Sequence, residues 1–183
     1  IDISYIFAKD GLKYLCAIKD MYDKSIVAHS ISPFIDLKLV TETVEQALVK
    51  VPYKQRQNLI LHSDQGWHFT NWQYRKLLVD NNIIQSISAR GSSVDNVPIE
   101  SFFSILKSEC IYLIDNLYKR DIETVVNNFI NYYNNERLQE KIKELTPIQF
   151  RELTLSASFL TFRFNQTGSF GVLFTYLVFL PIA

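Results

Sequence analysis

The hydrophobic pattern of this chain changes its period near Asp36, and that change limits the possible folds more than any other feature. Before it, apolar residues alternate with polar ones or form short runs, a pattern typical of β-strands, at residues 1–8, 12–18 and 25–31. Only short turns separate these runs, which favours an antiparallel meander. After Asp36 the apolar residues return every three or four positions, so a helix is expected to follow the three strands.

The remaining elements are predicted in the order strand, helix, strand, helix, helix. The two further strands are expected at residues 58–62 and 83–87, and the helix between them is expected to begin at a Thr70 N-cap. A loop at 88–96 precedes a helix with Pro98 in its first turn, and one more helix follows. This order predicts an α/β domain in which helices flank one five-stranded mixed sheet, and it matches the order of the ribonuclease H-like fold.

Composition narrows the class of protein without indicating its function. At 183 residues the chain is long enough for one domain with a real core, and 48% apolar residues exclude disorder. Nineteen basic residues balance 19 acidic ones, so any DNA binding must come from a local site and not from the total charge. Cys16 and Cys110 lie in apolar runs and are predicted to be reduced, and no secretory signal opens the chain, which favours a cytoplasmic protein. The apolar run at 171–183 is too short for a membrane span.

Two acidic residues stand at positions suited to a shared metal site. Asp64 ends a predicted buried strand, Glu100 lies in the first turn of a predicted helix, and 35 residues lie between them. Asp2, on the first predicted strand, is the candidate third acid. Carboxylates from separate elements can hold Mg²⁺ ions that activate a nucleophile and stabilise a leaving oxygen. Taken singly, each of these acids is more simply a surface charge, as is expected of Asp20 and Asp23 in a turn.

The residues around these acids form four short motifs. They are His-Ser-Asp-Gln-Gly at 62–66, Asp-Asn followed by Glu-Ser-Phe-Phe and Leu-Lys-Ser-Glu at 95–109, Tyr-Asn-Asn-Glu-Arg at 133–137, and Thr-Pro with a later Phe at 146–150. In combination they resemble the catalytic core of insertion-sequence transposases of the OrfB type, which is similar to the core of retroviral integrases. The resemblance covers residues 1–153, which are expected to form an N-terminally truncated catalytic core, and it leaves 154–183 as an apolar tail.

This resemblance implies a role for particular residues. Asp2, Asp64 and Glu100 match the three acids that bind the catalytic metal, which is Mg²⁺ with Mn²⁺ able to substitute. Lys107, two helical turns after Glu100, matches a basic residue that contacts the transposon-end DNA. The implied reaction is cleavage of DNA at the element's ends, followed by transfer of the freed 3′-hydroxyl to a target phosphodiester. Transposon ends and target DNA are the implied partners, and a homo-oligomer is the implied assembly.

The residues beside Asp64 are predicted to support the site. His62 and Ser63 end the strand that leads to it, and Gly66 follows it. Direct metal ligation by His62 is not expected, because Mg²⁺ prefers oxygen ligands. His68 is expected to be a loop residue.

Two other polar residues have more than one possible role. Asn96 is predicted to cap the helix of Glu100 or to hold a backbone turn. Arg137 is predicted either to bind DNA or to pair with an acid. Ser92 and Ser93 stand where the resembled family often has Gly and Asn.

Three hypotheses about function are open at this point. The first is a transposase core that cleaves and joins DNA, and the second is a nuclease of the same fold without strand transfer. The third is an inactive fragment that binds only DNA or partner protomers. It is favoured by Asp2 at the chain start, where the strand has no lead-in residues, and by the lack of helix-turn-helix segments before Ile1.

Overall fold

The computed structural model describes residues 1–8, 11–89, 96–114 and 120–164, with side chains as far as residue 156. Ser92, Ser93 and the end of the predicted apolar tail lie outside these ranges. Within them, no helix combines the length and the apolar character that crossing a bilayer requires.

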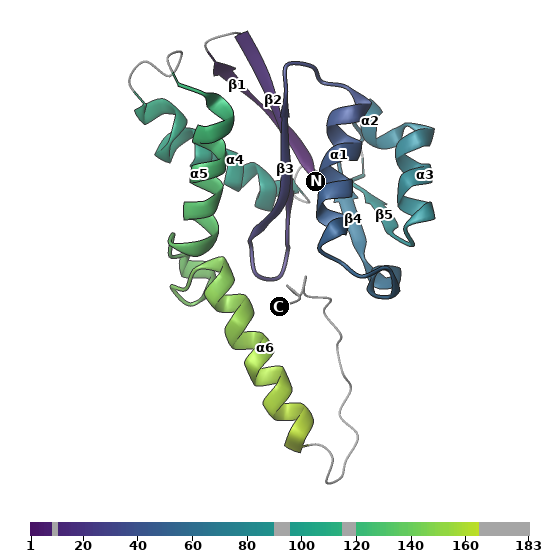
Figure 1. Ribbon diagram of the computed structural model, residues 1–183, viewed down its shortest axis with the longest axis vertical. Coiled ribbons are helices and arrows are strands. Elements are labelled where there is room, and N and C mark those ends of the chain that lie inside the picture. Colours follow the sequence, from purple (N-terminus) through teal and green to yellow (C-terminus); the bar gives the residue numbers. More distant parts are fainter. Residues whose placement is uncertain (9–10, 90–95, 115–119, 165–183) are drawn as a thin grey trace.

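The first three strands form the predicted antiparallel meander. They are β1 (Asp2–Ala8), β2 (Gly11–Lys19) and β3 (Ile26–Ser32), paired in the order β1-β2-β3 (Figure 1). In this register Asp2 lies opposite Ala17 and Tyr5 lies opposite Tyr14. The pairing of β2 with β3 shifts between Ile18 and Lys19.

The second group of elements alternates helix and strand. It contains α1 (Leu37–Val49), β4 (Ile60–Ser63), the short α2 (Trp67–Thr70), α3 (Trp72–Asp80) and β5 (Ile84–Ile87). β4 pairs with β5 in parallel. The Asp36 side chain caps α1 by accepting from the Leu39 amide at 2.9 Å. The prediction that Thr70 is the N-cap of the next helix was wrong. Asn71 caps α3, and its side chain accepts from the Gln73 amide. Asn71 has the extended backbone of an N-cap, whereas Thr70 is the last residue of α2.

The predicted single five-stranded sheet is not confirmed. The strands pair as one sheet of three and one sheet of two. The Ile1 ammonium donates to the His62 carbonyl at 2.8 Å and so links the start of β1 to β4. This backbone bond does not make a ladder, because β1 begins only at Asp2.

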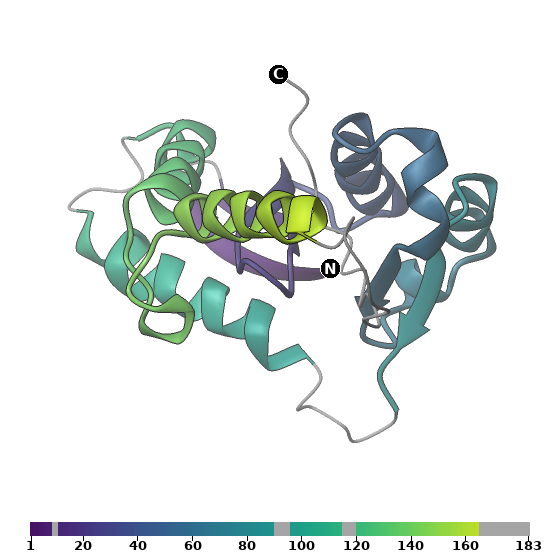
Figure 2. The ribbon, with the colours of Figure 1, turned by 90° about the horizontal axis from the view of Figure 1, so that it is seen from below.

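Helices cover both faces of the β1–β3 sheet, and the strand period explains how. Successive residues of β2 point to opposite faces, so Cys16 and Ile18 pack with α1 and α3, while Leu15 and Ala17 pack with the helices α4 (Val97–Glu109) and α5 (Ile122–Asn135). Figures 1 and 2 show α4 and α5 on one side of this sheet and α1 to α3 on the other. The largest side chains of the second face come from these two helices: Phe102, Phe103, Leu106, Val126, Phe129, Ile130 and Tyr133. Cys16 and Cys110 are both free, as predicted.

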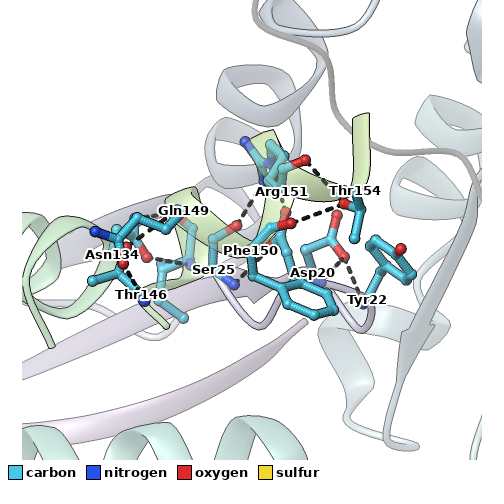
Figure 3. Close-up of polar contacts among 11 residues, drawn as sticks. Asp20, Tyr22, Ser25, Asn134, Thr146, Gln149, Phe150, Arg151 and Thr154 are labelled. Atoms are coloured by element: carbon cyan, nitrogen blue, oxygen red, sulfur yellow. Dashed lines mark hydrogen bonds and ion pairs between the residues drawn. The ribbon is translucent and has the colours of Figure 1, made fainter. Parts of the chain in front are cut away.

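The last helix, α6 (Pro147–Phe164), is fastened to the turn between β2 and β3 (Figure 3). Arg151 makes an ion pair with Asp23 and donates to the Ser25 hydroxyl at 2.8 Å. Asp23 is fully buried and Asp20 is 7% exposed, so the prediction that both are surface charges was wrong. Local sequence could not reveal this burial, because the helix that covers the turn begins more than 120 residues later.

The Thr-Pro-x-x-Phe motif begins α6 and explains how it docks. The Thr146 amide donates to the Gln149 side chain at 3.1 Å and the Gln149 amide donates to the Thr146 hydroxyl at 3.2 Å, which is a capping box. Pro147 occupies the first helical position, where its missing N–H costs nothing. The Phe150 ring then packs on Tyr22 with centroids 5.5 Å apart. α6 continues through the predicted domain boundary at residue 153.

Candidate active site

Asp64 follows the last residue of β4, and a tight turn fixes its carboxylate. Its Oδ1 accepts from the Gly66 amide at 2.8 Å. Ser63 is fully buried, and its hydroxyl donates to the Asp64 carbonyl at 3.1 Å. A Cβ at position 66 would lie 3.0 Å from the Asp64 Oδ1 and 2.9 Å from the His68 Nε2. A side chain at position 66 would crowd these two atoms, which explains the glycine two residues after Asp64 in the motif.

The two histidines near Asp64 have different environments. Each ring nitrogen of His62 lies 2.9 Å from a serine hydroxyl, Nδ1 from Ser86 and Nε2 from Ser88, so the ring ties β4 to the end of β5. Both ring nitrogens of His62 are therefore engaged within the chain. His68 is not in a loop as expected but lies in α2, 8% exposed, because its ring packs edge-on between Trp67 and Phe69. Burial lowers the pKa of His68, and the Asp64 carboxylate opposes that shift.

Asp2 stands at the start of β1, where it is partly buried. Its Oδ1 accepts from the Ile3 amide at 2.7 Å. Burial raises the pKa of Asp2 to about 6, and the Asp64 and Glu100 carboxylates add to the rise, against the Ile3 hydrogen bond and the chain-terminal ammonium. Since both other acids act on Asp2 through space, the three predicted acids share one electrostatic environment.

Glu100 is exposed in the first turn of α4, where the positive end of the helix dipole favours a carboxylate. Asn96 occupies the N-cap position, but its side chain makes no capping hydrogen bond, because its backbone is already helical instead of extended. The first turn is held instead by Lys19, whose ammonium donates to the Pro98 carbonyl at 2.9 Å and to the Tyr133 hydroxyl at 3.0 Å.

The three acids do not close around one point. Within the part of the chain that the structure describes, no three His, Cys, Asp or Glu side chains lie close enough to hold one metal ion. None of Asp2, Asp64 and Glu100 takes part in an ion pair with a described Lys or Arg side chain.

Comparison with known proteins decides the family. Residues 1–93 match a family described as an integrase core domain, and residues 100–155 match a second family of the same description. This chain belongs to the integrase core domain family.

The relatives of this integrase core are insertion-sequence proteins. It is 36% identical over 149 residues to the putative transposase InsK of IS150 from Escherichia coli, which covers 81% of this chain and 52% of InsK. It is 34% identical to a transposase-like protein of Haemophilus influenzae, covering 85% of this chain and 70% of that protein. It is 31% identical to the IS3 transposase InsF of E. coli, covering 85% and 54%. The chain thus spans about half the length of InsK and InsF.

Solved structures confirm the fold. The catalytic core of HTLV-2 integrase, solved with magnesium, aligns with a TM-score of 0.65 at 14% identity, covering 81% of this chain and 91% of that one. A simian T-cell lymphotropic virus intasome chain aligns with a TM-score of 0.71 at 12% identity, covering 81% and 51%. The α/β fold of this integrase core is therefore the ribonuclease H-like fold of integrase catalytic cores.

The two predicted DNA-binding residues of this integrase core both have partners within the chain. Lys107 lies on α4 with its ammonium 4.5 Å from the centre of the Tyr5 ring. Arg137 makes two hydrogen bonds to Glu109, at 2.7 and 2.6 Å, and this pairing lowers the pKa of Glu109. The pair joins the end of α4 to the end of α5, which is one of the two roles predicted for Arg137.

Sequence patterns did not reveal Lys19 and Tyr5 as neighbours of the site. Lys19 ends a strand in which only residues 15–18 are buried, and a lone lysine there predicts only a solvated strand end. The alternation of β1 could have drawn attention to Tyr5, since it places an aromatic ring three residues after Asp2 on an edge strand.

Proposed function

We propose that this integrase core cleaves DNA at the ends of an insertion sequence and joins the freed 3′ ends to target DNA. The observation that carries the proposal is the placement of Asp2, Asp64 and Glu100 at the start of β1, after the end of β4 and in the first turn of α4 of an integrase core domain. The relatives named as insertion-sequence transposases support it.

The donor set fits Mg²⁺, with Mn²⁺ able to substitute. Three carboxylates supply hard oxygen ligands, and burial together with repulsion from Asp64 and Glu100 raises the pKa of Asp2, an effect that a bound cation would offset. When bound, the metal would activate the attacking oxygen and stabilise the leaving one. Asp2, Asp64 and Glu100 would hold it. An HTLV-2 integrase core of the same fold was solved with magnesium, which supports this choice.

The residues of the chain bind and orient, and none forms a covalent bond to DNA. In cleavage, water attacks the phosphorus and the 3′-oxygen leaves as a hydroxyl. In joining, that hydroxyl attacks a target phosphodiester and expels the target's own 3′-oxygen, so one bond forms for each that breaks. Lys107 offers its ammonium to a DNA phosphate near the acids, and Arg137 is a second candidate contact.

The neighbours of the acids have supporting roles in this proposal. Gly66 permits the turn that aims Asp64, Ser63 and His62 fix the strand end before it, and Asn96 begins the helix of Glu100. Residues 1–153 are the proposed core. We further propose that β1 and β4 belong to one five-stranded sheet, supported by the Ile1–His62 backbone bond.

The partners follow from the reaction and not from the charge of the chain. We propose transposon ends and target DNA as substrates, a homo-oligomer that pairs two ends, and the bacterial cytoplasm as the place of action. The intasome chain and the dimeric and trimeric crystal forms of the HTLV-2 core support an assembly of copies.

The test is an assay of cleavage and joining on duplex DNA carrying the terminal sequence of the encoding element. Asp64→Asn and Glu100→Gln should each abolish both products in Mg²⁺ and in Mn²⁺. Glu45→Gln, at an exposed acid on α1, is the matched control and should keep full activity. Undiminished products from Asp64→Asn would refute the assignment of the acids. Cleavage of generic duplexes without joining would identify the nuclease, and no metal-dependent product from the unaltered chain would identify a fragment that only binds.

A further inference from the structure

His68 is a polar side chain at a position that an apolar ring could fill. It is 8% exposed, and its ring packs edge-on against Trp67 and Phe69, with centroids 5.1 and 4.7 Å away. Its Nδ1 is buried and has no hydrogen-bond partner among the described residues. Because a buried polar atom without a partner costs free energy, packing alone would favour phenylalanine here. A role for the other ring nitrogen would explain the histidine.

The other edge of the His68 ring is turned toward Asp64. A Cβ on Gly66 would lie 2.9 Å from the His68 Nε2, 3.3 Å from the His68 Cδ2 and 3.0 Å from the Asp64 Oδ1. The Nε2 and the Oδ1 are therefore no more than about 6 Å apart, a gap that one water molecule can bridge with two hydrogen bonds. The Asp64 Oδ1 already accepts from the Gly66 amide at 2.8 Å, so a donor on Nε2 would act on the same oxygen.

These surroundings favour one tautomer of the neutral His68 ring. A neutral imidazole carries a single N–H, either on Nδ1 or on Nε2. A proton on Nδ1 would bury a donor that has no acceptor among the described residues, and it would turn the lone pair of Nε2 toward a carboxylate. A proton on Nε2 instead places a donor on the side of Asp64. The Nε2–H tautomer is therefore the one that the geometry favours.

We propose that His68 is a positioning residue for Asp64, and that its Nε2–H donates to the Asp64 Oδ1 through one water molecule. Together with the Gly66 amide, this donor would fix the carboxylate and leave its Oδ2 for the cation. The inference rests on the proposed function, because it concerns an acid that the metal needs. Hydrogen-bond partners of this kind orient metal ligands, and their loss typically weakens metal binding by about 10–100-fold.

The first measurement determines the tautomer in the metal-free chain. The histidines are labelled with ¹⁵N, and the correlation of ring nitrogens with ring protons at pH 8 distinguishes Nε2–H from Nδ1–H. The chain has three histidines, and the signals of His68 are those absent from His68→Gln. We expect the Nε2–H tautomer. Asp64→Asn should shift the His68 ring signals, because it removes the charge of the acceptor, whereas Glu45→Gln, at an exposed acid on α1, should not.

The second measurement is the affinity of the folded chain for Mn²⁺, determined by calorimetry without DNA. His68→Phe keeps a ring between Trp67 and Phe69 and removes the donor, so the dissociation constant should rise about tenfold. His68→Gln still has a donor and should stay within about threefold of the unaltered chain. His29→Phe is the matched control: this histidine of β3 lies 2.6 Å from the Asn127 side-chain oxygen, and its loss should leave the affinity unchanged.

The outcomes distinguish this inference from the proposed function. An Nδ1–H tautomer overturns the inference, and so do His68 signals that Asp64→Asn leaves in place. A His68→Phe chain that binds Mn²⁺ as tightly as the unaltered chain, and differs only in its urea unfolding, would show that the ring has a packing role and that the inference is wrong. The Nε2–H tautomer with its Asp64 dependence, in a chain that binds no Mn²⁺, would keep the contact and remove the proposed metal chemistry.

Discussion

Gly66 shows how a single residue constrains the site. An alanine Cβ there would lie 2.9 Å from the His68 Nε2 and 3.0 Å from the Asp64 Oδ1, and the His68 ring is wedged between two aromatic neighbours. We therefore expect Gly66→Ala to displace the Asp64 carboxylate, to lower DNA cleavage at least tenfold, and to destabilise the fold by about 1–2 kcal/mol. Cleavage rates and urea unfolding measure the two effects.

A second substitution identifies the cause. In a His68→Ala background the closest contact is gone, so Gly66→Ala should cost clearly less stability than it does alone. An equal cost in both backgrounds would show that the strain lies in the backbone and not against the ring.

Lys19 makes stability depend on pH in the alkaline range. Burial lowers the pKa of Lys19 to about 8 from 10.5, and the charges of Lys24, Lys141 and Arg137 add to the shift. Between pH 8 and 10.5 the unfolded chain therefore binds more protons than the folded one, and the free energy of unfolding rises with pH in that window. At about 1.4 kcal/mol per pKa unit, the shift from 10.5 to about 8 gives a gain of about 3–4 kcal/mol.

The measurement compares urea unfolding of the unaltered chain and Lys19→Met at pH 7.5, 9 and 10. The difference between the two chains should shift in favour of the unaltered chain as pH rises. A difference that stays constant over this range would show that the Lys19 ammonium keeps an ordinary pKa in the fold.

Single residues also show what could be predicted from the sequence. The turn at Asp64 and Gly66 is local, so four consecutive motif residues were enough to place the acid. The contacts of Lys19 are not local: Pro98 and Tyr133 lie 79 and 114 residues away. No pattern near position 19 encodes them, and the residue that fixes the first turn of α4 could only be found in three dimensions.

Elements with a long, regular apolar stripe were predicted correctly, and short ones were not. α4 and α5 have 13 and 14 residues and a buried face, so periodicity located them. α2 has only four residues, too few for any period to show, and no local pattern indicated the break at Asn71 between it and α3. The docking of α6 was missed for a different reason, since its acidic partner lies in a distant turn.

The Asp23–Arg151 pair should contribute much of the free energy that holds α6 against the turn between β2 and β3. The Asp23 side chain is fully buried and that of Arg151 is 11% exposed, so removing one partner leaves a buried charge. We expect Arg151→Met to destabilise the chain by about 3 kcal/mol, and the double variant Asp23→Asn with Arg151→Met to cost clearly less. Lys76→Met, which breaks the exposed Lys76–Asp80 pair, is the control and should cost less than about 1 kcal/mol. Equal costs for the single and double variants, measured by urea unfolding, would show that packing and not charge holds the helix.

At the scale of the molecule, the α/β class followed from the order of the elements, whereas the relative positions of the candidate site residues did not. Element order was sufficient for the α/β class and for the three-stranded meander, because each strand pairs with its neighbour in the sequence. The joining of β1 to β4 depends on a contact between two residues that are 61 positions apart in the sequence, and it remains a prediction. The three acids come from elements of both sheets and of α4, so their geometry depends on how these parts sit together, which no local motif specifies.

Binding of a divalent cation should therefore stabilise the entire fold. Asp2, Asp64 and Glu100 repel one another without a cation, and a metal shared among them ties β1, β4 and α4 together. At a concentration about 100 times the dissociation constant, binding to the folded state alone contributes about 2.7 kcal/mol. We expect thermal unfolding to shift upward in Mn²⁺ or Mg²⁺ and to return when the cation is chelated.

The acid variants make that expectation specific. Asp64→Asn should remove the metal-dependent shift and, in metal-free buffer, should unfold at a slightly higher temperature than the unaltered chain, because one source of repulsion on Asp2 is gone. Glu45→Gln should keep the full shift, since that exposed acid lies on α1 and away from the three. A metal-dependent shift of equal size in Asp64→Asn would place the cation elsewhere on the chain and would separate these acids from metal binding.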